Sequence, residues 1–325
     1  MKPEHMNPTR TILLCFALLV ACAPWARAQQ EAQYTQFTHD KLYFNPAYAG
    51  ARGATTVGLI ARAQWVGFEG APLSQALRAH IPLARSRVGL GLSVDNDIIG
   101  FSRSTGVKLA YSYRLKLGKR TRLNLGVDAS VREYRVDYST ARRGDLVDFT
   151  LASEVASLQR LPSVGAGAFL YEERFYLGVS VPRMTRGIIF APGGGRGTGL
   201  SVEVPHLFLM GGVDLPASRE IHVRPSFNAK YAPKAPLSLD LNVMTVLRER
   251  VAIGGGYRGG GLDAPLQPAA LDAIVQVMPH DELTIGIAYG YPLSRLGGQQ
   301  AGSFEALVEY TFLHPRRRRV KCYYF

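Results

Sequence analysis

The fold is decided by the stretch from Asn45 to Pro82, which reads NPAYAGARGATTVGLIARAQWVGFEGAPLSQALRAHIP. Between Thr55 and Trp65 apolar residues alternate with polar or small ones, and the alternation returns between Ser74 and Leu83. Successive side chains of a β-strand point to opposite faces, so each run has one apolar and one polar face. The segment Val66–Pro72 supplies the glycines and proline of a connecting loop. The stretch therefore predicts a β-hairpin.

The same two-faced pattern recurs down the chain in about fourteen runs of about nine to twelve residues, the length that a tilted strand needs to cross a bilayer. A soluble β-sandwich shows the same alternation. The predicted connections, however, alternate between short turns and longer loops, as in membrane barrels. At one end of the barrel the connections are expected to be long, and they include 97–103, 137–161 and 182–205. Among the connections at that end, only 232–236 is short. Within 137–161 the sequence leaves open a short helix or a further hairpin.

A sheet in lipid has to close, because an open edge leaves backbone groups unpaired at a cost of several kcal/mol each. We therefore predict an all-β protein over residues 55–313, a transmembrane antiparallel up-and-down β-barrel of about 14 strands in the outer membrane. On its polar face we expect charges of both signs, which form a salt-bridged interior that closes the lumen, line an aqueous path, or simply make up the solvated polar face that any such barrel requires. These residues are Arg62, Arg78, Asp95, Lys108, Arg114, Lys116, Asp128, Arg132, Arg224, Lys230, Asp240, Glu305 and Glu309.

The first 28 residues have the pattern of a secretory signal peptide. Lys2 and Arg10 precede an apolar run that is too short to span a bilayer as a helix, and Ala26 and Ala28 form a small-x-small cleavage site. Processing as a lipoprotein at Cys22 is the alternative. After cleavage behind Ala28 only Cys322 remains, which excludes an intrachain disulfide.

The positive net charge of the chain indicates that its partners are anionic. The net charge is +13 at pH 7, and for a protein of the envelope the expected counter-charges are outer-membrane lipid, lipopolysaccharide and acidic proteins, with no nucleic acid. We expect a multi-pass protein of the bacterial outer membrane with both termini in the periplasm.

Five motifs follow one another in the first part of the chain. They are Gln36-Phe37, NPAYAG at Asn45–Gly50, QWVGFEGAP at Gln64–Pro72, the run from Val88 to Gly100, and YSYRL at Tyr111–Leu115. In these motifs the chain resembles the PorP/SprF family of type IX secretion system membrane proteins. The resemblance implies a Bacteroidota outer-membrane barrel that works with a secretion and gliding apparatus. It further implies help in exporting or surface-anchoring adhesins and proteases, and contacts with periplasmic lipoprotein or ring components.

The NPAYAG motif is the first candidate partner-binding element. Pro46 fixes its own φ and pushes Asn45 out of the helical region, which predicts a rigid bend. We expect residues 29–54 to form a periplasmic N-terminal segment in which Asn45, Pro46, Tyr48 and Gly50 contact a partner and Tyr48 rests on the barrel rim. A plain strand entry is the alternative.

Two further candidates lie elsewhere. Trp65 and Phe68 form either a partner-binding anchor, since aromatic residues dominate interaction hot spots, or part of an interfacial aromatic belt. Residues 314–325 form a basic periplasmic tail containing Arg316, Arg317, Arg318 and Arg319, which suits an acidic partner or a solvated chain end. The other belt candidates are Phe101, Tyr111, Tyr113, Tyr171, Tyr176, Tyr289 and Tyr291.

Catalytic motifs are absent from the sequence: there is no Gly-x-Ser-x-Gly, His-Glu-x-x-His or phosphate-binding loop. Asp95-Asn96-Asp97 lacks the spacing of a calcium loop. We predict a protein that is not an enzyme and has no cofactor or metal. A solute-conducting porin or fatty-acid-type channel is the alternative function, and a lipid-modifying enzyme, which needs a Ser/His or Asp/His pair at one rim, is a third.

Overall fold

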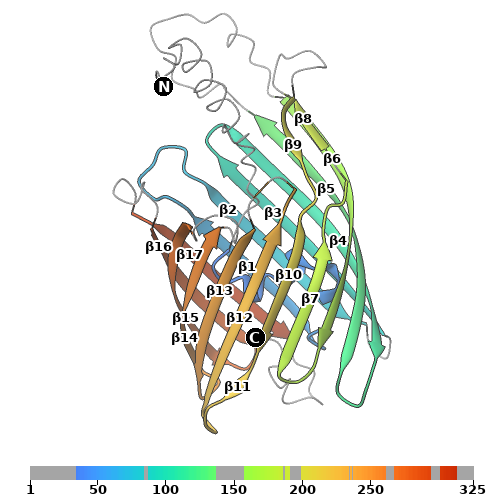
Figure 1. Cartoon of the computed structure of the whole chain (residues 1–325), viewed down its shortest axis with the longest axis vertical. Coiled ribbons are helices and arrows are strands. Elements are labelled where there is room, and N and C mark those ends of the chain that lie inside the picture. The colour runs from blue at the N-terminus through green and yellow to red at the C-terminus, as the bar shows by residue number, and fades with distance from the viewer. Residues whose placement is uncertain are drawn as a thin grey trace, which may run out of the picture. The chain divides into compact units, whose positions relative to one another are not determined.

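The computed structural model describes residues 34–83, 87–136, 157–185, 187–190, 199–233, 235, 237–260, 267–293 and 301–312. All of them fall within one compact unit, residues 31–325. Its main feature is a single antiparallel sheet, shown in Figure 1.

Among the described residues this sheet contains 15 strand segments, and it closes into a ring because β10 pairs with both β7 and β12. The short β11 follows β10 after Asp214 and pairs with the same neighbour, β12. Because β10 and β11 together form one strand of the ring, the ring has 14 strands. The predicted strand number and antiparallel barrel are confirmed. The segments are β1 (Thr55–Ala63), β2 (Leu73–Pro82), β3 (Val88–Ile99), β4 (Ser102–Lys116), β5 (Arg122–Val136), β6 (Ser157–Tyr171), β7 (Phe175–Val181), β10 (Leu207–Val213), β11 (Leu215–Pro216), β12 (Ile221–Tyr231), β13 (Ser238–Leu247), β14 (Val251–Gly260), β15 (Gln267–His280), β16 (Leu283–Pro292) and β17 (Ser303–Phe312).

The two faces of the strands divide as the alternation predicts. Leu109 on β4 and Ile287 on β16 point outward and are 62% and 61% exposed, whereas the neighbouring Lys108 and Ala288 are buried inside. An apolar band of this kind on the outside of a closed barrel is the surface that a bilayer covers. The ring therefore has the arrangement of a membrane barrel, with its charges turned inward.

The two ends of the barrel differ in their connections. We call the end with connections 83–87, 117–121, 172–174, 217–220, 248–250 and 281–282 the turn end, and the other the loop end. The expectation that 97–103 is a long loop is wrong: β3 and β4 extend to a tight turn at Gly100 and Phe101, which the positive φ of Gly100 permits.

Two long connections contain more strand than expected. Residues 157–161, predicted as loop, belong to β6, while 137–156 lie outside the described residues. Within 182–205 the chain forms a separate hairpin of β8 (Gly187–Phe190) and β9 (Gly199–Glu203).

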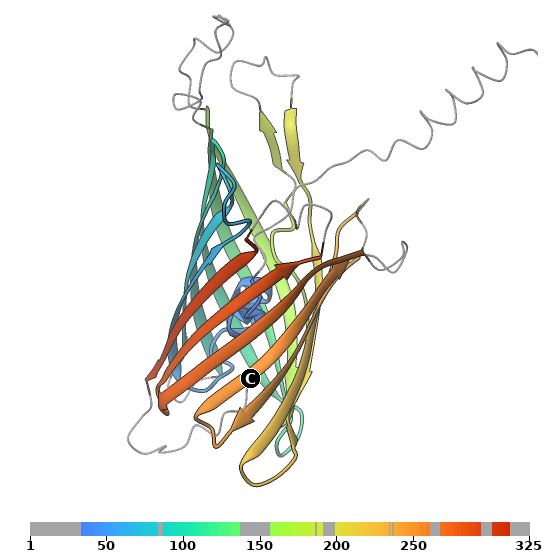
Figure 2. The same cartoon turned by 90° about the vertical axis from the view of Figure 1, so that its left-hand side faces the viewer.

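The N-terminal segment differs most from the expectation. Residues 34–50, drawn in blue in Figure 2, lie within the ring of strands and contact opposite walls of it. They contain η1 (Phe37–His39), α2 (Lys41–Phe44) and η2 (Pro46–Tyr48), and every residue except His39 is buried. The prediction of a segment outside the barrel is thus wrong for residues 34–50, which we call the plug; residues 29–33 lie outside the described part of the chain.

Candidate functional site: the plug and the barrel rim

The plug's second half is shaped by the NPAYAG motif itself. The Asn45 side chain accepts a hydrogen bond from the Ala47 amide at 2.9 Å and so caps η2, in which Pro46 occupies the first turn. Proline is favoured there because its fixed φ suits the first turn and no partner is needed for the missing N–H. The predicted rigid bend is therefore present, but inside the barrel.

The bend rests on a row of small residues that runs across β3 to β7. In each neighbouring strand the residue at this level is glycine or serine, and the pairing register aligns them side by side. We call this set the small-residue row: Gly89, Ser112, Gly126, Gly167 and Ser180.

The glycines of the row leave room for the plug backbone. A Cβ atom on Gly89 would lie 2.1 Å from the Ala49 carbonyl oxygen, and one on Gly126 would lie 2.3 Å from the Ala47 amide nitrogen. Both distances are far below van der Waals contact, and both neighbours are backbone atoms. The plug therefore approaches the wall more closely than any side chain allows.

Polar side chains of the same strands bind the carbonyl groups of the plug. Ser112 donates to the Ala49 oxygen at 2.6 Å, Asn124 to the Ala47 oxygen at 3.0 Å, and Ser180 to the Phe44 oxygen at 2.7 Å. Asn45 in turn donates from Nδ2 to the Ala168 oxygen of β6 at 2.9 Å. Because irregular backbone buried in a membrane barrel has no water to bind, these partners are what makes the plug's conformation possible.

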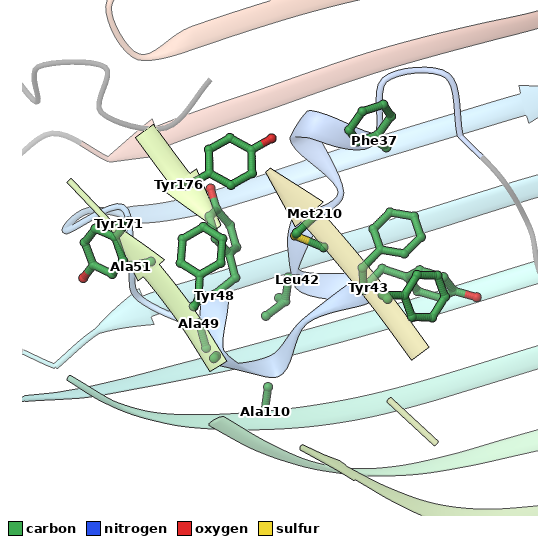
Figure 3. Close-up of a cluster of buried hydrophobic side chains, with 14 residues drawn as sticks. Phe37, Leu42, Tyr43, Tyr48, Ala49, Ala51, Ala110, Tyr171, Tyr176 and Met210 are labelled. Atoms are coloured by element: carbon green, nitrogen blue, oxygen red, sulfur yellow. The ribbon is translucent and has the colours of Figure 1, made fainter. Parts of the chain in front are cut away.

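An aromatic cluster fills the space beside the row (Figure 3). The ring of Tyr48 meets Phe169 edge-on at 5.4 Å, and Phe169 stacks on Tyr176 at 5.6 Å. The Lys41 ammonium lies 4.8 Å from the centre of the Tyr176 ring. Tyr171 and Tyr176 were expected in an interfacial belt; they instead face inward and are buried.

Charged residues of the opposite wall hold the first residues of the plug. Both carboxylate oxygens of Glu305 on β17 accept backbone amides, from Thr35 at 2.7 Å and Gln36 at 2.8 Å. Arg62 on β1 lies 3.3 Å from the same carboxylate and donates to the Thr35 hydroxyl at 2.7 Å. Asn242 on β13 donates to the Thr35 carbonyl at 2.8 Å.

Arg258 on β14 is the fourth wall residue that contacts this end of the plug. It pairs with Asp240 at 3.2 Å and Asp272 at 3.3 Å, and donates to the Thr35 hydroxyl at 3.1 Å. The guanidinium that contacts the plug is therefore also neutralised by two carboxylates.

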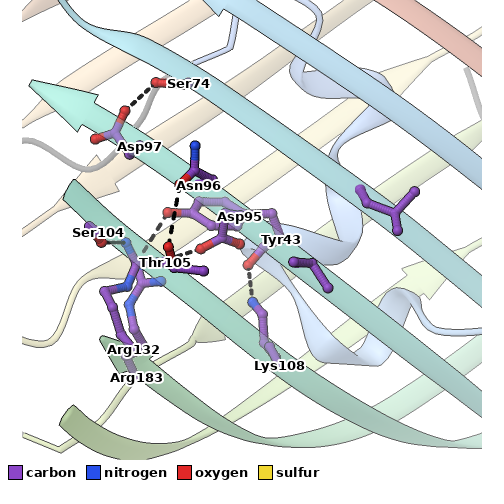
Figure 4. A network of polar contacts seen from close by, with 12 residues as sticks. Tyr43, Ser74, Asp95, Asn96, Asp97, Ser104, Thr105, Lys108, Arg132 and Arg183 are labelled. Atoms are coloured by element: carbon purple, nitrogen blue, oxygen red, sulfur yellow. Dashed lines mark hydrogen bonds and ion pairs between the residues drawn. The ribbon is translucent and has the colours of Figure 1, made fainter. Parts of the chain in front are cut away.

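A third set of charges lies against the middle of the plug; Figure 4 shows Asp95, Lys108, Arg132 and Arg183 of this set beside Tyr43. Arg78 pairs with Asp40 of the plug at 2.6 Å, and Arg132 pairs with Asp95 at 2.9 Å. Lys108 donates to the Tyr43 carbonyl.

A small cavity of about 10 Å³ lies against this network. Asp95, Lys108, Arg132 and Arg183 are among its lining residues. It has room for about one water molecule. Of the arrangements considered for the interior charges, the described residues show salt bridges, such as those of Arg62, Arg78, Arg132 and Arg258.

Trp65 and Phe68 lie at the loop end, away from the plug's NPAYAG motif. They are 46% and 41% exposed, and Phe101 of the adjoining turn is 44% exposed. One backbone hydrogen bond joins the two connections that carry them, from the Gly100 amide to the Gly70 oxygen at 2.9 Å. A second joins Val66 to Gly302, just before β17, at 3.0 Å. We call Trp65, Phe68 and Phe101 the rim aromatics.

The structure thus separates the predicted site residues into two places. Asn45, Pro46, Tyr48 and Gly50 meet inside the barrel, the rim aromatics gather at the loop end, and Arg316, Arg317, Arg318 and Arg319 lie outside the described residues. The small-residue row was missed, although glycine and serine recurring at inward positions of neighbouring strands is a signal that the sequence carries.

In the described part of the chain, none of the helices has the length and apolar character required to cross a membrane. No group of three or more histidine, cysteine or carboxylate side chains among these residues is placed to hold a metal ion.

Ring closure, an apolar outer band and a polar, occupied lumen define an outer-membrane β-barrel that carries an internal plug. The family model described as "Type IX secretion system membrane protein PorP/SprF" matches residues 26–310. The chain therefore belongs to the PorP/SprF family of type IX secretion system membrane proteins.

Solved structures resemble the chain at low sequence identity. Omp33 of Acinetobacter baumannii has a TM-score of 0.45 and 7% identity, with 80% of this chain and 98% of that chain covered. The P. putida toluene transporter TodX has a TM-score of 0.46 and 14% identity, covering 83% and 93%. The monoaromatic hydrocarbon channel CymD has a TM-score of 0.48 and 12% identity, covering 86% and 94%. A search of curated proteins gives no match.

Proposed function

We propose that this protein is an outer-membrane component of the type IX secretion system that acts through protein–protein contacts at its two ends, helping to export or surface-anchor secreted proteins. Family membership and the plug support this proposal. A lumen occupied by buried, hydrogen-bonded backbone suits a binding barrel better than a conduit. The gliding-associated role and the Bacteroidota origin implied by the resemblance are part of the proposal.

The rim aromatics are the proposed contact for an exported adhesin or protease. Large aromatic side chains dominate interaction hot spots, and the hydrogen bonds between their connections hold this surface in one shape before a partner arrives. Trp65 also has a φ of +50°, a strained backbone conformation for a residue other than glycine. An interfacial belt explains exposed aromatic rings, but not why two connections join to present them.

The turn end is the proposed contact for a periplasmic lipoprotein or ring component. Strand β17 ends there at Phe312, and the basic tail, residues 314–325, follows it in the sequence. Arg316, Arg317, Arg318 and Arg319 favour an acidic surface on that partner.

The test is the surface proteome of cells that carry single-copy variants. Deletion of the gene is expected to remove specific adhesins or proteases from the cell surface, and W65A/F68A is expected to reduce the same proteins at least threefold with the barrel still assembled. Y291A is the matched control, because Tyr291 is 57% exposed on a strand face at the loop end. If W65A/F68A and Y291A reduce the surface proteins equally, Trp65 and Phe68 belong to an interfacial aromatic belt. If deletion of the gene leaves the surface proteome unchanged, the export role is contradicted.

The solute channel is the alternative, and the same strains decide it. Loss of nutrient uptake on deletion, with surface proteins intact, supports a porin or fatty-acid-type channel. The occupied lumen argues against this alternative, because small solutes have to pass where the plug lies.

A further inference from the structure

Strand β6 is paired on both sides over only part of its length. All its residues from Ser157 to Tyr171 pair with β5, whereas β7 pairs only with residues 166–171. The cause is strand length, because β4, β5 and β6 have 15 residues each and β7 has 7. At the loop end β6 therefore continues past β7 as the edge of the sheet.

The chain turns away from β6 after β7. Met184 donates its amide to the Val164 carbonyl at 2.7 Å, and among the described residues β8 and β9 then pair only with each other. Within the same described residues, no strand pairs with Leu158–Pro162 on the side away from β5. We call Leu158–Pro162 the β6 edge.

The backbone groups of the β6 edge have a fixed orientation. Successive residues of a strand direct their N–H and C=O groups to alternate sides, and the Val164 carbonyl points away from β5, toward Met184. Leu158 and Arg160 lie an even number of residues from Val164, so each directs an N–H and a C=O to the same open side. Pro162 adds a carbonyl alone. Such a row of groups is what a further strand binds.

Charged side chains place the β6 edge beyond the lipid. The outer face of the sheet is apolar and exposed as far as Val107, Val131 and Val164. Charges on a lipid-facing surface are unfavourable, so the part that carries them lies in water, where hydrated backbone groups allow an edge to stay open. The charged residues on this face beyond the three valines are Arg103, Glu133, Arg135 and Arg160.

This outer face has a surplus of positive charge beside the β6 edge. Arg160 pairs with Glu133 at 2.9 Å, while Arg103 and Arg135 lie directly opposite each other on β4 and β5. Like charges that lie opposite each other in a sheet are unfavourable. Carboxylates on a strand added beside Arg160 would offset this repulsion, so the charge of the face complements an acidic partner.

We propose that the β6 edge binds an extended acidic segment of an exported protein, which adds to the sheet as a further strand where β7 has ended. Main-chain hydrogen bonds at Leu158 and Arg160 hold the segment, and the surplus arginines favour acidic side chains on it. That the partner is an exported protein rests on the proposed function, whereas the binding mode follows from the edge. A second copy of this chain fits less well, because it brings two Arg160 side chains to the same short edge.

Proline at position 160 tests the binding mode. R160P removes an N–H that faces the open side, and proline is tolerated at such positions of edge strands. R160A removes the same charge and keeps the amide, so it is the matched control. Both variants are made in the full-length protein at single copy, and their assembly is checked by heat-dependent migration on gels. The readout is the surface amount of the proteins that deletion of the gene removes.

Cells with R160P are expected to retain at least threefold less of these surface proteins than cells with R160A. Equal retention by the two assembled variants overturns strand addition and leaves the export role intact. A surface proteome that deletion of the gene does not change overturns both. A dimer of the barrel that R160P abolishes identifies a second copy as the occupant, which also overturns the proposal.

Hydrogen exchange keeps the proposal testable if R160P does not assemble. The wild-type barrel is purified alone and in complex with a surface protein that deletion removes. The amides of Leu158 and Arg160 are expected to exchange at least tenfold more slowly in the complex, because each gains a main-chain acceptor. Unchanged exchange at these two amides overturns the proposal.

Discussion

The two walls that face the plug hold it by different physical means. Where it meets residues 45–50 of the plug, the wall from β3 to β7 offers small residues, serine and asparagine donors and aromatic rings, so the plug backbone lies directly against it. Of the charged residues on this wall, Lys108 binds the plug at Tyr43. The wall from β13 to β17, with Arg62 of β1, offers ionic groups: Glu305 accepts from the Thr35 and Gln36 amides, and Arg62 donates to the Thr35 hydroxyl. The first wall determines the plug's shape by steric fit, and the second fixes one end by charge.

This difference between the two walls determines which substitutions the plug tolerates. Contacts between backbone and backbone have no side chain that can move aside, so any added atom displaces the plug. Ionic contacts are made by long side chains, and losing one partner leaves the others buried and unpaired at one place only. We therefore expect global release of the plug from changes in the small-residue row and local release from changes at Glu305.

The largest effect is expected from G126A. Its Cβ would lie 2.3 Å from the Ala47 nitrogen, and we expect the plug to be destabilised by about 3 kcal/mol or more. Lys41 is buried at 1% exposure, so trypsin cleavage after Lys41 in the detergent-solubilised barrel reports release. G58A is the matched control, because its Cβ would sit 3.7 Å from the nearest atom, in Glu309. Equal trypsin resistance of G126A and G58A contradicts the steric account.

The next effect is expected from E305A. It leaves the Thr35 and Gln36 amides and Arg62 without their carboxylate, at a cost of about 3 kcal/mol confined to this end. Hydrogen exchange should quicken at Thr35 and Gln36 while Ala47 and Ala49 stay protected. E220A, which breaks an exposed pair with Arg248 at 2.9 Å, should change neither. Exchange that quickens equally along the whole plug shows that the two walls act as one.

A smaller effect is expected from N45A, which removes a cap on η2 and a hydrogen bond to β6. Each contributes about 1 kcal/mol, so we expect a loss of about 2 kcal/mol in the protection of the Ala47 amide. N45S keeps a side-chain oxygen that can cap η2 and loses the amide that donates to Ala168. It should therefore fall between wild type and N45A, and an N45S loss equal to that of N45A assigns the effect to the β6 contact alone.

The smallest effect is expected from S112A. It removes the hydroxyl that binds the Ala49 carbonyl at 2.6 Å and leaves the glycine contacts of the row in place. The expected loss is about 1 kcal/mol in protection of the Ala49 amide. S130A is the control on the neighbouring strand, since the Ser130 hydroxyl reaches only a strand carbonyl, at 3.5 Å. If S112A lowers the protection of the plug by more than G126A does, the ranking of steric fit above hydrogen bonding is refuted.

The wall was predictable from the sequence because its cause is periodic. Runs such as Val107, Leu109 and Tyr111 against Lys108 and Ser112 determine which face meets lipid, and closure follows from unpaired backbone at the edges. The tight turn at Gly100 was not predicted. Aspartate and asparagine are typical of turns and loops, so Asp95-Asn96-Asp97 does not reveal that the strand continues to the turn.

The plug was not predictable from local pattern. Residues 34–50 carry no alternation, and their helical pieces are too short to give a helical period. Their conformation depends on partners more than 60 residues away in sequence, such as Ser112 for Ala49 and Glu305 for Thr35. Asn45 and Pro46 revealed the bend, because capping and proline geometry are local, but not its place inside the barrel.

The central claim is that the plug occupies the lumen of the assembled barrel, and conductance in planar bilayers tests it most directly. Purified wild-type protein is expected to insert without a steady ionic current, and G126A is expected to add long-lived openings under the same voltage and salt. A steady current of porin size from the wild-type protein, unchanged in G126A, would contradict the account.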